Sequence, residues 1–265
     1  MIFCIDIGNT NIKYAVFDGD NLKATFRVSS QKYGTSDEYG VIVRDLLKTA
    51  NILKSDIKGA IMSSVIPSLN YTMEHMCRDY LGLTPLIVGP GIKTGLNIKA
   101  DNSKEVGSDI IADSVSAMNR YGGKQRPIIC IDFGTATTFD IISERNELLG
   151  VVIAPGIKGS LDSLVNGTAN LPSIELDTPP SIIAKNTVNS MKAGIIYGFA
   201  GMVDSIVKRI KTELKREDAF VVATGGMSGI IEKQSTEIDV IDRSLTINGL
   251  KVLYELNEED NEQKG

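Results

Sequence analysis

The segment Ile5-Asp6-Ile7-Gly8-Asn9-Thr10-Asn11 recurs in altered form as Ile131-Asp132-Phe133-Gly134-Thr135-Ala136-Thr137. Each copy directly follows a short apolar run, MIFC or PIIC, that is typical of a buried strand. An Asp at the end of a strand, a Gly two residues later and small hydroxyl or amide side chains predict a tight turn whose backbone N–H groups can hold phosphate. Two such turns facing each other would bind the phosphates of one nucleotide from both sides.

The composition narrows the function classes. The 265 residues allow one large core or two cores of ordinary size, and the repeat favours two. The net charge of -5 disfavours nucleic acid as the main ligand, because no basic surplus is available to neutralise phosphates. The single histidine, His75, leaves almost no material for a Ser-His-Asp triad or a His-rich zinc site.

The cysteines and the N-terminus indicate a cytoplasmic protein. Cys4, Cys77 and Cys130 share no metal-ligand spacing, and we interpret them as reduced core residues. The chain starts directly in a strand pattern, without a basic region, a cleavage site or an apolar run of about 20 residues. We therefore expect no membrane partner.

The order of elements predicts an α/β fold with two duplicated domains, each a mixed sheet flanked by helices. In the first half we expect strands over 1–4, 12–17, 22–28, 58–65 and 85–88, and helices over 35–50, 67–81 and 105–121. In the second half we expect strands over 127–132, 138–142, 148–153 and 220–223, and helices after 157, over 186–215 and over 246–256. The predicted domains are residues 1–120 and 121–256, followed by a disordered acidic tail over 257–265.

The phosphate-binding pattern GxxxxGK[ST] is absent, so phosphate binding would fall to the paired turns and to the glycine turn at Gly225-Gly226. In the first turn Asp6 could hold magnesium through water, and Lys13 could add positive charge. The amide and hydroxyl side chains between them could donate to phosphate: Asn9, Thr10 and Asn11. A single Asp-x-Gly turn is more often a plain tight turn, but two in register with a later Thr-Gly-Gly favour a phosphate site.

Three acidic residues at helical spacing can be interpreted as part of a substrate site or as an exposed, solvated helix face. Glu105, Asp109 and Asp113 follow one another at intervals of four, which predicts three carboxylates on one face of a helix start. A glycine-rich loop, Gly89 to Gly95, precedes them and could bring a substrate there.

A basic cluster follows near the end of the predicted helix over 186–215. We interpret its positive charges as stabilising the negative end of the helix dipole, and its members are Lys208, Arg209, Lys211, Lys215 and Arg216.

Ordered motifs along nearly the whole chain resemble the type III pantothenate kinases, within the superfamily that also holds acetate and sugar kinases, heat-shock chaperones and actin. The matching motifs are DIGNTN at Asp6, GPGIKTGLNI at Gly89, EVGSD at Glu105, DFGTATTFD at Asp132, APGI at Ala154, TANLP at Thr168, KNTVNSM at Lys185, YGFAG at Tyr197 and ATGG at Ala223.

The resemblance implies two ribonuclease H-like (actin-like ATPase) domains with ATP between them, and a homodimer in which the second domains pair. It implies transfer of the γ-phosphate of ATP to the primary hydroxyl of pantothenate, giving 4'-phosphopantothenate, the first step of coenzyme A biosynthesis. The cofactors implied are Mg2+ and an activating K+ or NH4+.

The resemblance also assigns site residues. Asp109 resembles the general base, and Asp132 the ligand of the monovalent cation. Contacts to ATP are implied for Asp6, Ile7, Gly8, Asn9, Thr10, Asn11, Ile12, Lys13, Thr135 and Gly225. Substrate contacts are implied for Gly107, Ser108, Asp109, Ile110 and, from the neighbouring subunit, Thr187.

The substrate motif departs from the family pattern. Where the family usually has Gly-Ala-Asp-Arg, this chain has Gly107-Ser108-Asp109-Ile110, and Asp113 stands where Asn is common. Loss of the arginine removes a charge-assisted hydrogen bond of roughly 1.5–3 kcal/mol to a carboxylate substrate. Lys158 and Lys99 are candidates to compensate for it.

Three alternatives therefore stand beside the pantothenate kinase. One is a non-catalytic or regulatory homologue, since the family includes proteins first described as accessory transcription factors. Another is a kinase for a related, less anionic pantothenate derivative. The third, an actin-like filament former, fits least because the chain is short for that branch.

Overall fold

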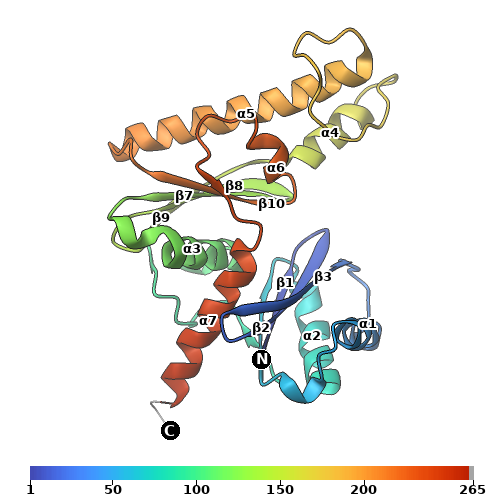
Figure 1. Ribbon diagram of the computed structural model, residues 1–265, viewed down its shortest axis with the longest axis vertical. Coiled ribbons are helices and arrows are strands. Elements are labelled where there is room, and N and C mark those ends of the chain that lie inside the picture. Colours follow the sequence, from blue (N-terminus) through green and yellow to red (C-terminus); the bar gives the residue numbers. More distant parts are fainter. Residues whose placement is uncertain (263–265) are drawn as a thin grey trace. The chain divides into compact units, whose positions relative to one another are not determined.

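The computed structural model describes residues 1–262, which form two compact units (Figure 1). Of the residues described, the first unit comprises Met1–Leu96, Asp101–Ser116 and 245–262. The second comprises Asn97–Ala100 and Ala117–Ser244. Among the described residues, no helix combines the length and the apolar character that a membrane span requires.

The two units have the same strand topology, which confirms the α/β fold with two mixed sheets. The first sheet has the order β3-β2-β1-β4-β5, and the second the order β9-β8-β7-β10-β11, with β6 added beyond β9. In both, the first three strands form an antiparallel meander, and two parallel strands follow on the other side of the first strand. The repeated sequence segments occupy the same place in each sheet, at the turn between its first two strands.

The first unit contains the following elements: β1 (Ile2–Ile7), β2 (Asn11–Asp18), β3 (Asn21–Ser29), α1 (Ser36–Thr49), β4 (Gly59–Ser64), α2 (Pro67–Met76), β5 (Leu86–Ile87), the start of α3 (Ser108–Tyr121) and α7 (Leu245–Glu262). Helix α1 begins with a capping box in which Thr35 and Glu38 bond each other's backbone N–H groups. After α2 the chain makes a π-helical turn, Cys77–Leu81, which ends at Gly82 in the left-handed conformation.

The second unit contains β6 (Asn97–Ile98), the end of α3, β7 (Ile128–Phe133), β8 (Ala136–Ile142), β9 (Glu147–Pro155), α4 (Ile157–Asn166), α5 (Thr187–Leu214), β10 (Phe220–Gly225), α6 (Ser228–Ile231) and β11 (Val240–Ile241). The sequence did not predict β6, α6 or β11. These have two to four residues, too short to show a hydrophobic period.

Side chains of β1 alternate between an apolar face in the core and an opposite face that carries Asp6. Phe3, Ile5 and Ile7 belong to the core that the sheet shares with α1 and α2. Cys4 and Asp6 lie on the opposite face, and α7 packs on that side of the sheet. Figure 1 shows α1 and α2 on one side of β1 and β2, and α7 on the other. The carboxylate of Asp6 is thereby separated from the main apolar core of its own unit.

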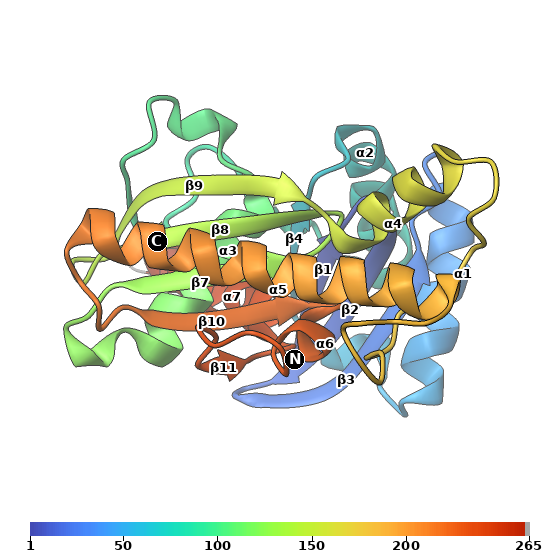
Figure 2. The ribbon, with the colours of Figure 1, turned by 90° about the horizontal axis from the view of Figure 1, so that it is seen from above.

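The second sheet repeats this division. Ile129, Ile131 and Phe133 of β7 belong to a core completed by α5, which contributes apolar side chains such as Val203 and Val207. Figure 2 shows α5 running across this sheet over β7, β8 and β10. Asp132 alternates with these core residues and lies on the other face, as Asp6 does in the first unit.

The closing helix α7 belongs to the first unit, not to a C-terminal domain ending at residue 256 as the sequence predicted. Backbones approach closely there, because a Cβ on Gly249 would collide with the carbonyl of Ala112. A Cβ on Gly59 of β4 would likewise collide with the ring of Tyr254. Contacts between residues so distant in the chain leave no local signal in the sequence.

The predicted disordered tail is wrong for residues 257–262, because α7 continues to Glu262. The side chain of Asn257 forms two hydrogen bonds with the backbone of Lys93. Its Nδ2 donates to the Lys93 carbonyl, and its Oδ1 accepts from the Lys93 N–H, both at 2.9 Å. The remainder of that prediction, 263–265, lies outside the described residues.

Candidate active site

The first repeated turn, between β1 and β2, is closed by its own backbone. The N–H of Gly8 donates to the carbonyl of Asn11 at 3.0 Å, and a Cβ on Gly8 would approach that oxygen to 3.1 Å. Ser30 supports the turn from the end of β3, its hydroxyl donating to the carbonyl of Gly8 at 2.6 Å. Asn9, Thr10 and Asn11 are exposed. Their polar side chains are therefore available to a ligand.

Asp6, at the end of β1, lies between two polar neighbours on adjacent strands. It is opposite Lys13 on β2 and opposite Ser63 on β4, whose hydroxyl donates to Asp6 Oδ1 at 2.9 Å. Burial raises the pKa of Asp6, while the charge of Lys13 and the Ser63 hydrogen bond oppose that rise. Asp109 raises the pKa of Asp6 further through charge repulsion. The two carboxylates are thus close enough to influence each other's ionisation.

Asp109 lies in the first turn of α3, in a partly buried position. Burial is the main cause that raises its pKa, and the backbone N–H of Ile110, which donates to Asp109 Oδ1 at 2.9 Å, opposes it. Gly107 gives the carboxylate room, because a Cβ there would collide with Asp109 Oδ1. A carboxylate with a raised pKa, fixed at a helix start, has the properties of a general base.

The three predicted helical carboxylates do not share one face of α3. Glu105 lies before the helix, in an exposed 3-10 turn (Ser103–Glu105), where it accepts a hydrogen bond from Asn102 at 2.6 Å. Asp113 is buried, with 2% of its surface exposed. The helix begins at Ser108, and the backbone of Val106 ahead of it is extended. Asp109 and Asp6 form the carboxylate pair instead.

The second repeated turn surrounds Asp132 with glycines. A Cβ on Gly134 would lie 3.0 Å from Asp132 Oδ2, and one on Gly225 would lie 2.6 Å from Oδ1. Gly225 also has a φ of +92°, which disfavours any side chain. Gly156 completes the arrangement, since its Cβ would collide with the carbonyl of Thr135. The backbone therefore packs closely around the carboxylate of Asp132, and only glycine fits at these positions.

The predicted site residues fall into two groups, one in each unit. The first unit holds Asp6 to Lys13 and Gly107 to Ile110, and the second holds Asp132, Thr135, Thr187 and Gly225. Thr135 is exposed in its turn, and Thr187 is the exposed first residue of α5, beside the capping residue Asn186. Sequence reasoning missed Ser30, Ser63 and Ser64, because a serine at a strand end carries no distinctive pattern.

The two lysines suggested as compensating cations differ in their surroundings. Lys99 forms an ion pair with Glu147 at 3.2 Å. Lys158, on α4, is exposed and lines a cavity of about 450 Å³ together with Leu161, Asp162, Glu175 and Met227. Lys158 therefore remains the better candidate for a ligand carboxylate.

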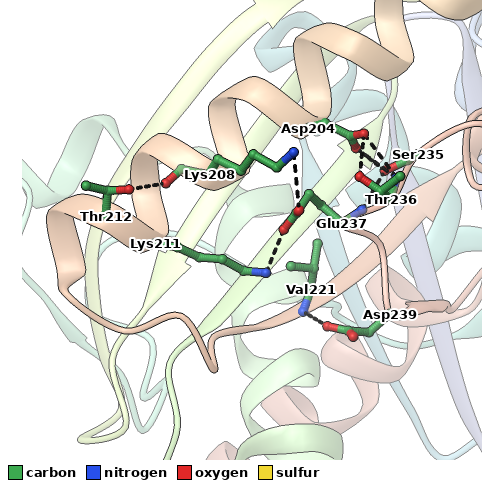
Figure 3. Close-up of polar contacts among 9 residues, drawn as sticks. All are labelled: Asp204, Lys208, Lys211, Thr212, Val221, Ser235, Thr236, Glu237 and Asp239. Carbon is green, nitrogen blue, oxygen red and sulfur yellow. Dashed lines mark hydrogen bonds and ion pairs between the residues drawn. The ribbon is translucent and has the colours of Figure 1, made fainter.

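The basic cluster at the end of α5 is largely occupied by structural ion pairs (Figure 3). Lys211 meets Glu237 at 2.7 Å and Lys208 approaches the same carboxylate at 3.8 Å. Arg216 is paired with Asp218 at 2.7 Å. Asp204 on the same helix accepts hydrogen bonds from Ser235 and Thr236, which fixes the segment before β11. These contacts support the structural interpretation of the cluster.

The family of type III pantothenate kinases matches residues 2–209. The chain belongs to that family. The match covers both repeated turns, all of α3 and most of α5, and membership implies an ATP-dependent kinase whose substrate is pantothenate. The resemblance read from the motifs is thus confirmed.

Solved structures with low sequence identity share the fold. A Campylobacter jejuni protein assigned to the Baf family of transcriptional activators is 16% identical, with a TM-score of 0.59, over 97% of this chain and 99% of that one. The polyphosphate/ATP-glucomannokinase from Arthrobacter sp. strain KM is 15% identical, with a TM-score of 0.52, over 96% and 98%. A ROK family glucokinase from Streptomyces griseus, in complex with glucose and AMPPNP, is 12% identical, with a TM-score of 0.50, over 97% and 99%. These likenesses support an actin-like ATPase kinase fold.

Proposed function

We propose that this chain transfers the γ-phosphate of ATP to the primary hydroxyl of pantothenate, with Asp109 as general base. The observation that carries the proposal is the pair of carboxylates in the first unit. Burial raises the pKa of Asp109, and Asp6 lies close enough for the two negative charges to repel each other. Family membership supplies the substrate class.

In the proposed reaction Asp109 accepts the proton of the acceptor hydroxyl and orients its oxygen toward the γ-phosphorus. The new O–P bond forms as the bond to the bridging oxygen breaks, and ADP leaves. Phosphoryl transfer has a loose transition state, so orientation is expected to contribute more than base strength. The raised pKa still helps, because it brings the base closer to the working pH.

The first turn would contact the phosphates through Asn9, Thr10, Asn11 and Lys13, and the second through Thr135 and the backbone at Gly225. Asp6 fits a magnesium site, because its carboxylate is a hard oxygen donor beside a second carboxylate. Asp132 would hold K+ or NH4+ through its carboxylate oxygens, as the resemblance of DFGTATTFD to the family motif implies. Bound magnesium would neutralise charge on the phosphates.

A homodimer through the second units is part of the proposal, with Thr187 reaching the neighbouring subunit's substrate. Exposed apolar side chains in the second unit support it: Leu149, Val152, Ile153, Leu164, Ile182, Ile183 and Val188. Ile153→Glu is expected to yield a monomer by light scattering. Leu53→Glu is the matched control, because Leu53 is equally exposed but lies in the first unit. An unchanged oligomeric state of Ile153→Glu would contradict this interface.

The acceptor is tested by ADP release with ATP, Mg2+ and K+, comparing pantothenate, pantetheine and no acceptor. We expect turnover that requires pantothenate and is lost in Asp109→Asn. Asp101→Asn, an exposed carboxylate on the preceding loop, should retain activity. Turnover with pantetheine alone would favour the less anionic acceptor, since Ile110 supplies no cation. ATP binding without turnover would favour the regulatory homologue.

A further inference from the structure

We propose that Ser108 is a positioning residue for Asp109, holding the first turn of α3 against the end of β4 so that the two carboxylates stay side by side. This proposal rests on the proposed function, in which Asp109 is the base. In this proposal the Ser108 hydroxyl forms hydrogen bonds with the backbone of its own unit and does not contact the substrate.

The hydroxyl of Ser108 bridges both backbone groups of Ser64. It accepts a hydrogen bond from the Ser64 N–H at 2.9 Å and donates one to the Ser64 carbonyl at 3.1 Å. A serine hydroxyl has a single proton to donate, so that proton is committed to Ser64. Ser108 is only 8% exposed, which shields both bonds from water.

The end of β4 therefore connects to both carboxylates through neighbouring residues. Ser63 donates to Asp6 Oδ1 at 2.9 Å, and Ser64 holds Ser108, the residue before Asp109. The hydroxyl of Ser64 closes a local turn with the N–H and carbonyl of Ile66, both at 3.1 Å. Because the Ser64 hydroxyl makes these two bonds, it does not replace the hydrogen bonds that Ser108 forms.

Loss of this bridge is expected to affect the rate more than the fold. Without the hydroxyl, the first turn of α3 is no longer fixed to Ser64, and the carboxylate of Asp109 gains freedom relative to Asp6. A displacement of about 1 Å of a reacting group can cost as much as a hundredfold in rate. We expect about a tenfold loss of kcat for Ser108→Ala, because the rest of α3 remains packed.

The first test is a double-mutant cycle in the full-length protein. Ser108→Ala should lower kcat about tenfold and leave the KM for ATP within about twofold. In the Asp109→Asn background the same substitution should lower the residual rate no further, because Ser108 acts through Asp109. An equal loss in both backgrounds would overturn the proposal.

Two further variants separate positioning from folding. Ser114→Ala removes the same atom from the same helix at a buried site, where the hydroxyl has no hydrogen-bond partner among the described residues, so it should leave kcat unchanged. Ser108→Thr retains the hydroxyl and should restore most of the rate. If Ser108→Thr is as slow as Ser108→Ala, the hydroxyl is not the cause.

The second test does not depend on turnover. Amide hydrogen exchange of Ser64 reports the hydrogen bond that its N–H donates to the Ser108 hydroxyl. Ser108→Ala should speed this exchange by about tenfold, and Ser114→Ala should not. An unchanged exchange rate in Ser108→Ala overturns the positioning role even in an active enzyme. Absence of any kinase activity, with faster exchange in Ser108→Ala, would contradict only the proposed function.

Discussion

The two repeated turns share one backbone plan but differ in what surrounds their aspartates. Asp6 lies opposite Lys13 and Ser63, and Asp132 lies opposite Thr138 and Thr224 in the same register. One position further along, the first unit has Ser64, whose backbone is bound by Ser108, and the second has Gly225 in a left-handed conformation.

This difference gives the two turns different surroundings within one backbone plan. The first unit surrounds its aspartate with hydrogen-bonding and charged groups. The second packs its aspartate against glycine backbone, and under the proposed function the two turns therefore have different roles.

The largest expected effect comes from Asp109→Asn. Loss of the base and of its orienting contact should lower kcat by about 10²–10⁴-fold. ATP affinity, measured by calorimetry, should change little, because the variant leaves both turns intact. Retention of more than a tenth of the wild-type kcat would contradict the role of the carboxylate pair.

Gly225→Ala should be the next most damaging. Its Cβ would lie 2.6 Å from Asp132 Oδ1 and from the backbone of Phe133, at a φ of +92°, so we expect a stability loss of about 1–3 kcal/mol and at least tenfold weaker ATP binding. Gly226→Ala is the matched control, since a Cβ there meets open space. Chemical denaturation and calorimetry measure the two effects. Equal losses of stability and of ATP affinity in Gly225→Ala and Gly226→Ala would contradict a special role for Gly225.

Lys13→Thr makes the first turn resemble the second, where Thr138 occupies the corresponding position. Loss of one charge-assisted contact to phosphate should weaken ATP binding by about tenfold. The same change should raise the pKa of Asp6 further, because Lys13 lowers it. A wild-type KM for ATP in Lys13→Thr would show that Lys13 does not contact the nucleotide.

The pH dependence should be the subtlest effect near neutrality. Burial raises the pKa of both Asp6 and Asp109, so kcat/KM should fall on the acid side at a pH above about 4, the ordinary range for Asp. Between the ordinary and the raised pKa the folded protein binds more protons than the unfolded one, so both groups lower the stability as the pH rises. Asp109→Asn should therefore raise the Tm at pH 7 while lowering activity. A lower Tm at pH 7 would contradict the raised pKa.

Local patterns in the sequence were sufficient to predict both turns, the long strands and most helices, because these follow from apolar periodicity and turn residues. They placed Asp109 at a helix start, and that prediction is confirmed by the structure. They could not place α7 on the first sheet, since the contact of Gly249 with Ala112 joins distant segments. They also could not show that Ser108 reaches Ser64, because the two are 44 residues apart.

Pantothenate phosphorylation can be followed by 31P NMR of the protein with ATP, Mg2+, K+ and pantothenate. We expect a new phosphomonoester signal that grows as ADP appears, with a coupling that places the phosphate on the primary hydroxyl. Asp109→Asn should not produce it. Formation of inorganic phosphate alone, or no change despite bound ATP, would contradict the assignment of Asp109 as the base of a pantothenate kinase.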